Sequence, residues 1–172
     1  PSGQADLPGG LTACREYGRM VLGPARPLER VKERTVTVPG VLSLEGNWTL
    51  RCEYRPSPIG GGENDGFFCF DCAKLKGPLR VRGRMSGDEL ALPGRPRRSL
   101  KKILIDRKVP RRRRESIPIL ADDLGVLAAA GIGPDSRRLA RDGAPALWVR
   151  FESVPGDRPP KDAERERVME DA

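Results

Sequence analysis

Short alternations of apolar and polar residues recur through the first third of the chain, and this period of two is typical of β-strands. The clearest covers residues 48–54, where every second side chain, from Trp48 through Leu50 and Cys52 to Tyr54, is expected to face the core. Weaker patterns predict shorter strands at three further places, residues 19–22, 35–38 and 41–44.

The segments around these strands are rich in glycine and proline, which favour turns and loops. We therefore expect residues 1–13 to form a loop-like lead-in and residues 55–66 to form a flexible loop. Residues 154–172 combine proline, glycine and charge with few apolar positions, so this segment is expected to be a disordered tail.

The period changes once, in the second half of the chain. Leu100, Ile103 and Leu104 recur at the spacing of one helix face, Ser99 suits an N-cap, and Pro110 ends the pattern. The other patterns predict four strands, of which the second and third form a hairpin, over residues 79–84, 117–120, 126–130 and 146–152. This order of elements predicts an α+β fold that is mostly antiparallel β with a short basic helix.

Positive charge is concentrated in one part of the chain. The 172 residues carry 32 Lys and Arg against 24 Asp and Glu, a net charge of +8. Residues 76–114 alone hold 15 basic and 3 acidic residues, so the remainder is slightly acidic. Such a block repels itself unless a polyanion or an acidic surface lies against it. Aromatic residues are only 5% of the chain and none lies between Phe70 and Trp148, which favours recognition of a duplex backbone over base stacking.

Several kinds of site lack the residues they need. The chain has no histidine, and its four cysteines, Cys14, Cys52, Cys69 and Cys72, include a single C-x-x-C pair, so we expect free thiols and no metal. No glycine-rich loop stands between a predicted strand and a predicted helix, so the chain is expected to hold no ATP site and no catalytic residue.

The ends and the hydropathy of the chain set two further expectations. No apolar run approaches the roughly 18 residues of a membrane span, so no membrane contact is expected. The first residues include neither an initiator Met nor a secretory signal, so we expect a cut end or a piece of a longer polypeptide.

Four segments of the basic half follow one another in a characteristic order. They are Leu79-Arg80-Val81-Arg82, Ser86-Gly87-Asp88-Glu89, the run SLKKILIDRKVP from Ser99 to Pro110, and Arg114 with Ile117-Pro118-Ile119-Leu120. In this order and spacing they resemble the C-terminal region of the tRNA(Ile)-lysidine synthetase (tRNA(Ile)-lysidine synthase) family. Upstream, Leu7-Pro8-Gly9-Gly10, Arg15-Glu16-Tyr17 and Phe70-Asp71 with Leu75 resemble the connecting segment of its longer members.

The resemblance implies a carbon–nitrogen ligase that acts on tRNA. Members of the family use ATP and Mg²⁺ to adenylate the first anticodon cytidine of tRNA(Ile) and then join lysine to it, which switches decoding from AUG to AUA. Their ATP site is an N-terminal Ser-Gly-Gly-x-Asp-Ser loop, which this chain does not contain. The chain is therefore interpreted as the tRNA-holding part of such an enzyme and is expected to be inactive alone.

The resemblance also implies binding partners and a cellular location. We expect tRNA(Ile), held by its acceptor arm, and the enzyme's own N-terminal catalytic domain as partners, in the cytoplasm, with a homodimer left open. The implied division is a β-rich connecting segment over residues 1–76, a C-terminal tRNA-binding α+β domain over 77–153 and the tail over 154–172. Two alternatives stay open: a stand-alone basic RNA-binding module without an enzymatic role, and a structural domain whose charge docks it on an acidic neighbour.

The family pattern and the charge distribution together assign candidate tRNA-binding side chains. These are Arg80, Arg82, Arg84, Lys101, Lys102, Lys108, Arg111 and Arg114. Gly87 and Asp88 are expected to form a structural turn, because an aspartate next to a glycine readily closes a tight turn with its own side chain.

Overall fold

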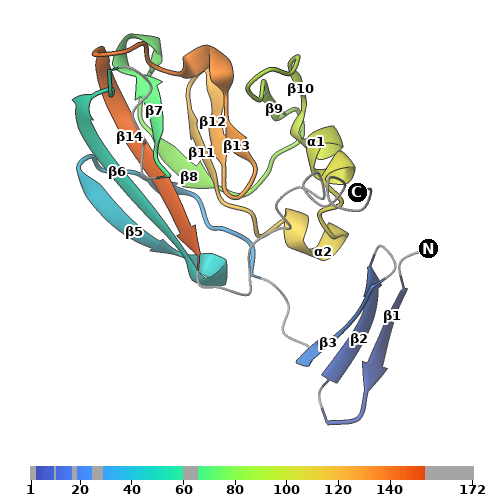
Figure 1. Ribbon diagram of the computed structural model, residues 1–172. Helices are drawn as coiled ribbons and strands as arrows, with labels where there is room; N and C mark the ends of the chain where they lie inside the picture. The colour runs from blue at the N-terminus through green and yellow to red at the C-terminus, as the bar shows by residue number, and fades with distance from the viewer. Residues whose placement is uncertain (1–2, 10, 17–18, 25–28, 60–65, 154–172) are drawn as a thin grey trace, which may run out of the picture.

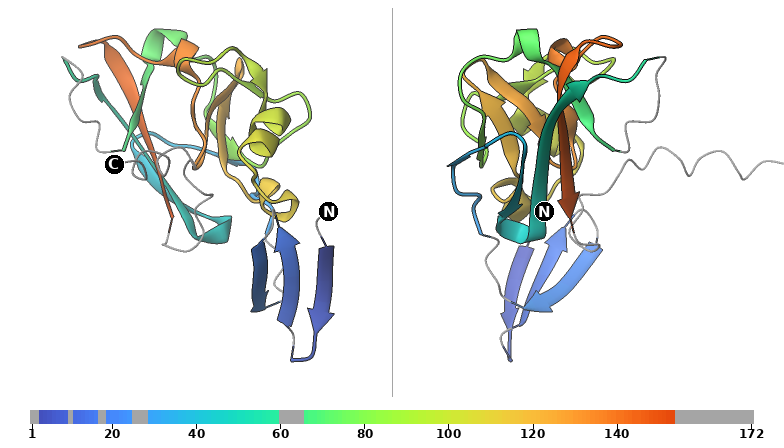
Figure 2. Two further views of the ribbon diagram at one scale, coloured as in Figure 1. Left: turned by 45° about the vertical axis from the view of Figure 1, so that its right-hand side comes forward. Right: turned by 90° about the vertical axis from the view of Figure 1, so that its left-hand side faces the viewer.

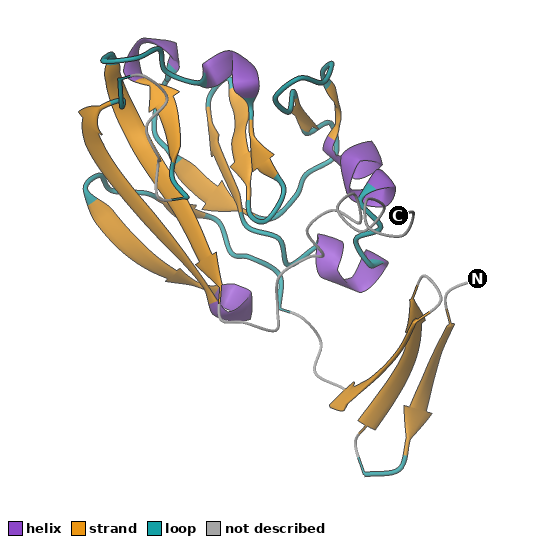
Figure 3. Cartoon of the chain, viewed as in Figure 1, coloured by secondary structure: helices purple, strands orange, loops and turns teal. Residues whose placement is uncertain are grey.

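The computed structural model describes residues 3–9, 11–16, 19–24, 29–59 and 66–153. Its strands and α-helices are β1 (Gly3–Leu7), β2 (Leu11–Glu16), β3 (Arg19–Pro24), β4 (Arg34–Thr35), β5 (Gly40–Leu44), β6 (Trp48–Pro56), β7 (Phe68–Asp71), β8 (Arg80–Arg82), β9 (Glu89–Leu90), β10 (Arg98–Ser99), α1 (Leu100–Asp106), α2 (Arg111–Arg114), β11 (Ile119–Asp122), β12 (Gly125–Ala129), β13 (Gly133–Pro134) and β14 (Pro145–Ser153), and 3-10 helices cover Glu45–Asn47, Cys72–Lys74 and Ser136–Arg138. Every strand pairing is antiparallel and the helices are short (Figure 3), which confirms the expected α+β class. None of the helices in these ranges is long and apolar enough to cross a membrane.

Two antiparallel sheets form the main body (Figure 1). One has the strand order β5-β6-β14-β7 and the other the order β13-β12-β11-β8-β4. Fully buried side chains from both sheets, such as Leu50, Val149, Val81 and Ile119, belong to a single hydrophobic core. Leu104 of α1 is also fully buried in this core, which ties the helix to the sheets.

The alternation predicted for residues 48–54 is confirmed over most of its length. Trp48, Leu50 and Cys52 are buried, whereas Tyr54 is 56% exposed. Strand β5 pairs with β6 only as far as Cys52, which faces Gly40, so among the described strands none pairs with Tyr54 on that edge of β6. The pattern therefore holds where a neighbouring strand continues the sheet and fails where it does not.

The prediction of a loop-like lead-in over residues 1–13 is wrong. Strands β1 and β2 pair with each other, and β3 pairs with β2, in a three-stranded antiparallel sheet. Figures 1 and 2 show this sheet standing beside the main body, at the end where α2 lies. Backbone hydrogen bonds join its strands, and of the leucine side chains described on it, Leu7, Leu11 and Leu22 are all exposed.

Several predicted boundaries shift. The strand expected over residues 35–38 is reduced to β4, and the one expected over 79–84 is reduced to β8, while the helix, the hairpin and the last strand are confirmed. The two parts expected over residues 1–76 and 77–153 contribute strands to the same two sheets. In one sheet β14 pairs with β6 and β7, and in the other β4 pairs with β8. The tail expected to be disordered and residues 60–65 of the expected loop lie outside the described residues.

Two buried aspartates fasten the loops around the five-stranded sheet. The side chain of Asp122 accepts hydrogen bonds from the backbone N–H groups of Lys76 and Leu124 and pairs with Arg138. Burial alone would raise the pKa of Asp135, but hydrogen bonds from the side chain and backbone of Arg137 outweigh it and hold that pKa below its ordinary value of 3.8. Both carboxylates are therefore structural anchors.

Candidate nucleic-acid interface

Three of the candidate tRNA-binding arginines, which lie in β8 or close after it, are all paired with carboxylates. The pairs are Arg80 with Asp123 at 3.0 Å, Arg82 with Asp88 at 2.9 Å, and Arg84 with Glu115 at 3.0 Å. Only the first two arginines lie in β8, with the buried Val81 between them. Their positive charge is thus largely compensated within the chain.

Arg82 is the most firmly held of the three. Its two terminal nitrogens each donate to one oxygen of Asp88, and both side chains are nearly buried, at 12% and 8% exposure. Asp88 also accepts from the backbone N–H of Met85, across a turn in which Gly87 has a φ of +87° that favours glycine. Gly87 and Asp88 therefore form a turn, and the carboxylate of Asp88 anchors Arg82.

Helix α1 presents lysines from a packed platform. The side chain of Ser99 caps the helix by accepting a hydrogen bond from the backbone N–H of Lys102. The helix residues Leu100 and Ile103 are buried on the side that faces the core. Lys101 and Lys102 lie away from the buried side of the helix, and both are exposed. The helix is therefore held on one side by the core and open on the other.

The connection from α1 to α2 turns sharply at Lys108. This residue has a φ of +53°, the left-handed conformation in which many helices end. The next residue, Val109, is buried at 1% exposure, and its N–H donates to Leu104. Pro110 is the N-cap residue of α2, and the first residue of that helix, Arg111, is exposed.

The last predicted arginine of this region has an internal role. The Nε of Arg114 donates to the backbone carbonyl of Val109 at 2.9 Å, so its side chain closes the connection between the two helices. Lys101, Lys102, Lys108 and Arg111 are different: within the described part of the chain, none of their side chains has a carboxylate partner. We call these four residues the α1–α2 face.

The cysteines lie in a different part of the molecule, around β14. Cys52 faces Val149 and Cys69 faces Trp148. Because successive residues of a strand point to opposite sides of the sheet, these two thiols lie on opposite faces. Cys52, Cys69 and Cys72 are free, and burial raises the pKa of Cys52 to about 12. No group of three or more His, Cys, Asp or Glu residues within the described ranges is arranged to hold a metal.

This arrangement predicts that the purified chain carries no zinc. A closed zinc site needs four ligands, whereas the sheet separates Cys52 from Cys69 and leaves the C-x-x-C pair with two thiols. Elemental analysis of protein purified without chelator should give well under 0.1 zinc per chain, an expectation that follows from the missing ligands. About one zinc per chain would show that the thiols gather in a way that this fold does not.

Comparisons with known proteins agree with the sequence resemblance. Residues 79–151 match the family model described as "TilS substrate C-terminal domain". The tRNA(Ile)-lysidine synthase of Geobacillus kaustophilus is 36% identical over 125 residues, which are 71% of this chain and 27% of that protein. The corresponding protein of Caldanaerobacter subterraneus is 32% identical over 126 residues, 70% of this chain and 27% of its own length.

A solved structure supports the same assignment. The crystal structure of a TilS C-terminal domain matches with a TM-score of 0.60 and 27% identity, covering 72% of this chain and 98% of that chain. The chain spans about a quarter of the length of the curated relatives it matches. The chain therefore belongs to the tRNA(Ile)-lysidine synthase family and carries its C-terminal domain.

Proposed function

We propose that this domain holds tRNA through phosphate contacts made by the α1–α2 face. One observation carries the proposal: Arg80, Arg82 and Arg84 are paired with carboxylates, whereas the four cations of this face have no such partner among the described residues. Unpaired lysines and arginines on a folded platform attract a polyanion and release its counterions on binding.

The local structure favours contact with a backbone rather than with bases. The face has no aromatic residue on which a base could stack, since residues 71–147 contain none. Its lysines extend from a helix whose other side is buried in the core, so the backbone loses little further conformational entropy on binding. These features suit a structured RNA whose phosphates lie in a fixed arrangement.

The wider role we propose is that of the relatives, which are named tRNA(Ile)-lysidine synthases. In this role the domain grips the acceptor arm of tRNA(Ile) in the cytoplasm, while an N-terminal catalytic domain of the full-length enzyme ligates lysine at the anticodon with ATP and Mg²⁺. No glycine-rich loop joins a strand to a helix within the described ranges, so we assign ATP and Mg²⁺ to no residue of this chain.

Binding measured against salt concentration tests the proposal. A tRNA transcript should bind the chain with an affinity that falls steeply with salt, because each neutralised phosphate adds about 0.7 to 0.9 to the slope of log affinity against log salt. A single-stranded RNA of equal length should bind more weakly. No binding of either RNA at physiological salt would favour a structural domain docked on an acidic neighbour, and equal binding of both would favour an unselective RNA-binding module.

The chain alone is expected to be catalytically silent. Its described residues provide no phosphate loop, and the chain has no histidine to act as an acid or base near neutral pH. Incubation with ATP, lysine and tRNA(Ile) transcript should therefore yield neither AMP nor lysidine above a protein-free blank. Formation of either product by the purified chain would contradict this prediction.

A further inference from the structure

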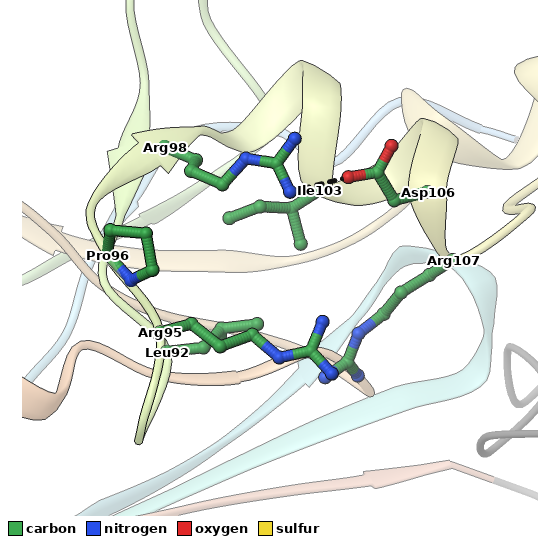
Figure 4. Close-up of a pocket in the computed structure, with 7 residues that line it drawn as sticks. All are labelled: Leu92, Arg95, Pro96, Arg98, Ile103, Asp106 and Arg107. Atoms are coloured by element: carbon green, nitrogen blue, oxygen red, sulfur yellow. Dashed lines mark ion pairs between the residues drawn. The ribbon is translucent and has the colours of Figure 1, made fainter. Parts of the chain in front are cut away.

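A small hollow lies between the β9–β10 hairpin and α1, outside the α1–α2 face (Figure 4). Seven residues line it: Leu92, Arg95, Pro96, Arg98, Ile103, Asp106 and Arg107. Its apolar lining is firmly packed, since Leu92 and Ile103 are only 5% and 6% exposed. Three guanidinium groups and one carboxylate stand over this lining.

The single carboxylate is already neutralised. A terminal nitrogen of Arg98 lies 2.7 Å from a carboxylate oxygen of Asp106, on the side of the hollow where the hairpin meets α1. This leaves two positive charges, those of Arg95 and Arg107, without a counter-charge among the residues that line the hollow.

The two remaining guanidinium groups converge. Figure 4 shows the side chains of Arg95 and Arg107, both of which line the hollow, extending toward one another. Arg107 is held in place because its Nη1 donates to the backbone carbonyl of Ile132 at 3.0 Å. Arg95 is exposed and has no hydrogen-bond or ion-pair partner for its side chain in the described part of the chain.

Two converging like charges repel each other unless an anion lies between them. An arginine offers five N–H donors in a planar fork, and Arg107 uses only one terminal nitrogen for Ile132, so donors remain on both side chains. A phosphate group carries the several acceptor oxygens that two forks can share, and none of the residues that line the hollow is an aromatic on which a base could stack.

We infer that Arg95 and Arg107 form a binding site for a single phosphate group of the RNA. This inference rests on the proposed function and adds to it a specific contact outside the α1–α2 face. Lys102 precedes Asp106 by one helical turn, so the edge of the hollow meets that face. An RNA backbone that lies along α1 can therefore place one phosphate in the hollow and neighbouring phosphates on the α1–α2 face.

The test compares two neighbouring arginines. The Arg95→Gln variant removes one fork, and the matched control is Arg97→Gln, because Arg97 lies on the same hairpin loop, pairs with Glu89 and does not line the hollow. Arg95→Gln should weaken tRNA binding about tenfold at low salt and reduce the salt slope by about 0.8, as expected for one lost phosphate contact. Arg97→Gln should change both by much less.

A direct readout separates failure of this site from failure of tRNA binding. Inorganic phosphate, compared with chloride at equal ionic strength, should shift the ¹⁵N resonances of the Nε groups of Arg95 and Arg107 but not that of Arg97. If phosphate shifts these signals but tRNA does not bind, the proposed function and the RNA contact are both wrong, and the two arginines form a site for a free anion. If tRNA binds and Arg95→Gln behaves like Arg97→Gln, this inference alone is overturned.

The source of the phosphate is decided by the same variants. Transcripts with a 5′-phosphate and with a 5′-hydroxyl are compared for wild type and Arg95→Gln. A difference between the two proteins that persists with the 5′-hydroxyl transcript identifies an internal phosphodiester. A difference that disappears identifies the terminal phosphate.

Discussion

Replacing Asp122 with alanine is expected to lower the free energy of unfolding by about 3 to 5 kcal/mol, because it leaves the partner of a buried ion pair uncompensated. The Asp122 side chain is fully buried, and Arg138 opposite it is 11% exposed. The same carboxylate also accepts from the N–H groups of Lys76 and Leu124 at 2.9 Å each. Its loss therefore releases three segments at once.

The next residue in the chain provides the control for this stability measurement. Asp123 pairs with Arg80 at 3.0 Å, but both side chains are well exposed, at 43% and 36%. Such surface pairs contribute at most about 1 kcal/mol, so Asp123→Ala should be close to wild type. Urea unfolding followed by circular dichroism measures both variants. An Asp122→Ala protein within 1 kcal/mol of wild type would contradict the anchoring role.

Reversing two charges on α1 is expected to have the largest effect on RNA binding. The Lys101→Glu, Lys102→Glu double variant removes two phosphate contacts and adds two repulsive charges. We expect tRNA affinity at low salt to fall about a hundredfold and the salt slope to fall by about two. The fold should survive, because both side chains are exposed and the buried residues of α1 are unchanged.

A charge-matched variant separates a local contact from the effect of net charge. Arg51 on β6 and Arg141 before β14 are exposed and have no ion-pair partner within the described ranges. The Arg51→Glu, Arg141→Glu protein has the same net charge as the α1 variant but keeps the α1–α2 face. Filter binding across a salt series should leave its slope close to that of wild type. If both double variants lose affinity equally, net charge rather than the α1–α2 face governs binding.

The elements that bury one face could be predicted from the sequence. Leu100, Ile103 and Leu104 of α1 and the alternating residues of β6 carry their periodicity because the core selects one side of each. The N-terminal sheet could not be predicted in this way. Its stability comes from backbone pairing between β1, β2 and β3, and backbone hydrogen bonds leave no apolar period in the side chains.

The candidate interface could be predicted only in part. The excess of positive charge was visible, but not its compensation, because the partners of Arg80 and Arg84 lie 43 and 31 residues further along the chain. The same limit applied to the hollow beside α1. Arg95, Arg97 and Arg98 look alike in the sequence, and only the fold separates the one that meets Arg107 from those that meet Glu89 and Asp106.

The most direct test of the account is site-specific photocrosslinking to tRNA from two exposed apolar positions. Ile105 lies on α1 among the lysines of the α1–α2 face and is 42% exposed, whereas Leu124 lies at the tip of the β11–β12 hairpin, next to the Arg80–Asp123 pair, and is 59% exposed. A photoreactive benzoylphenylalanine replaces each residue in turn. The account predicts efficient crosslinks from position 105 and background levels from position 124. Crosslinks from position 124 with none from position 105 would place the tRNA on the arginines of β8 and contradict it.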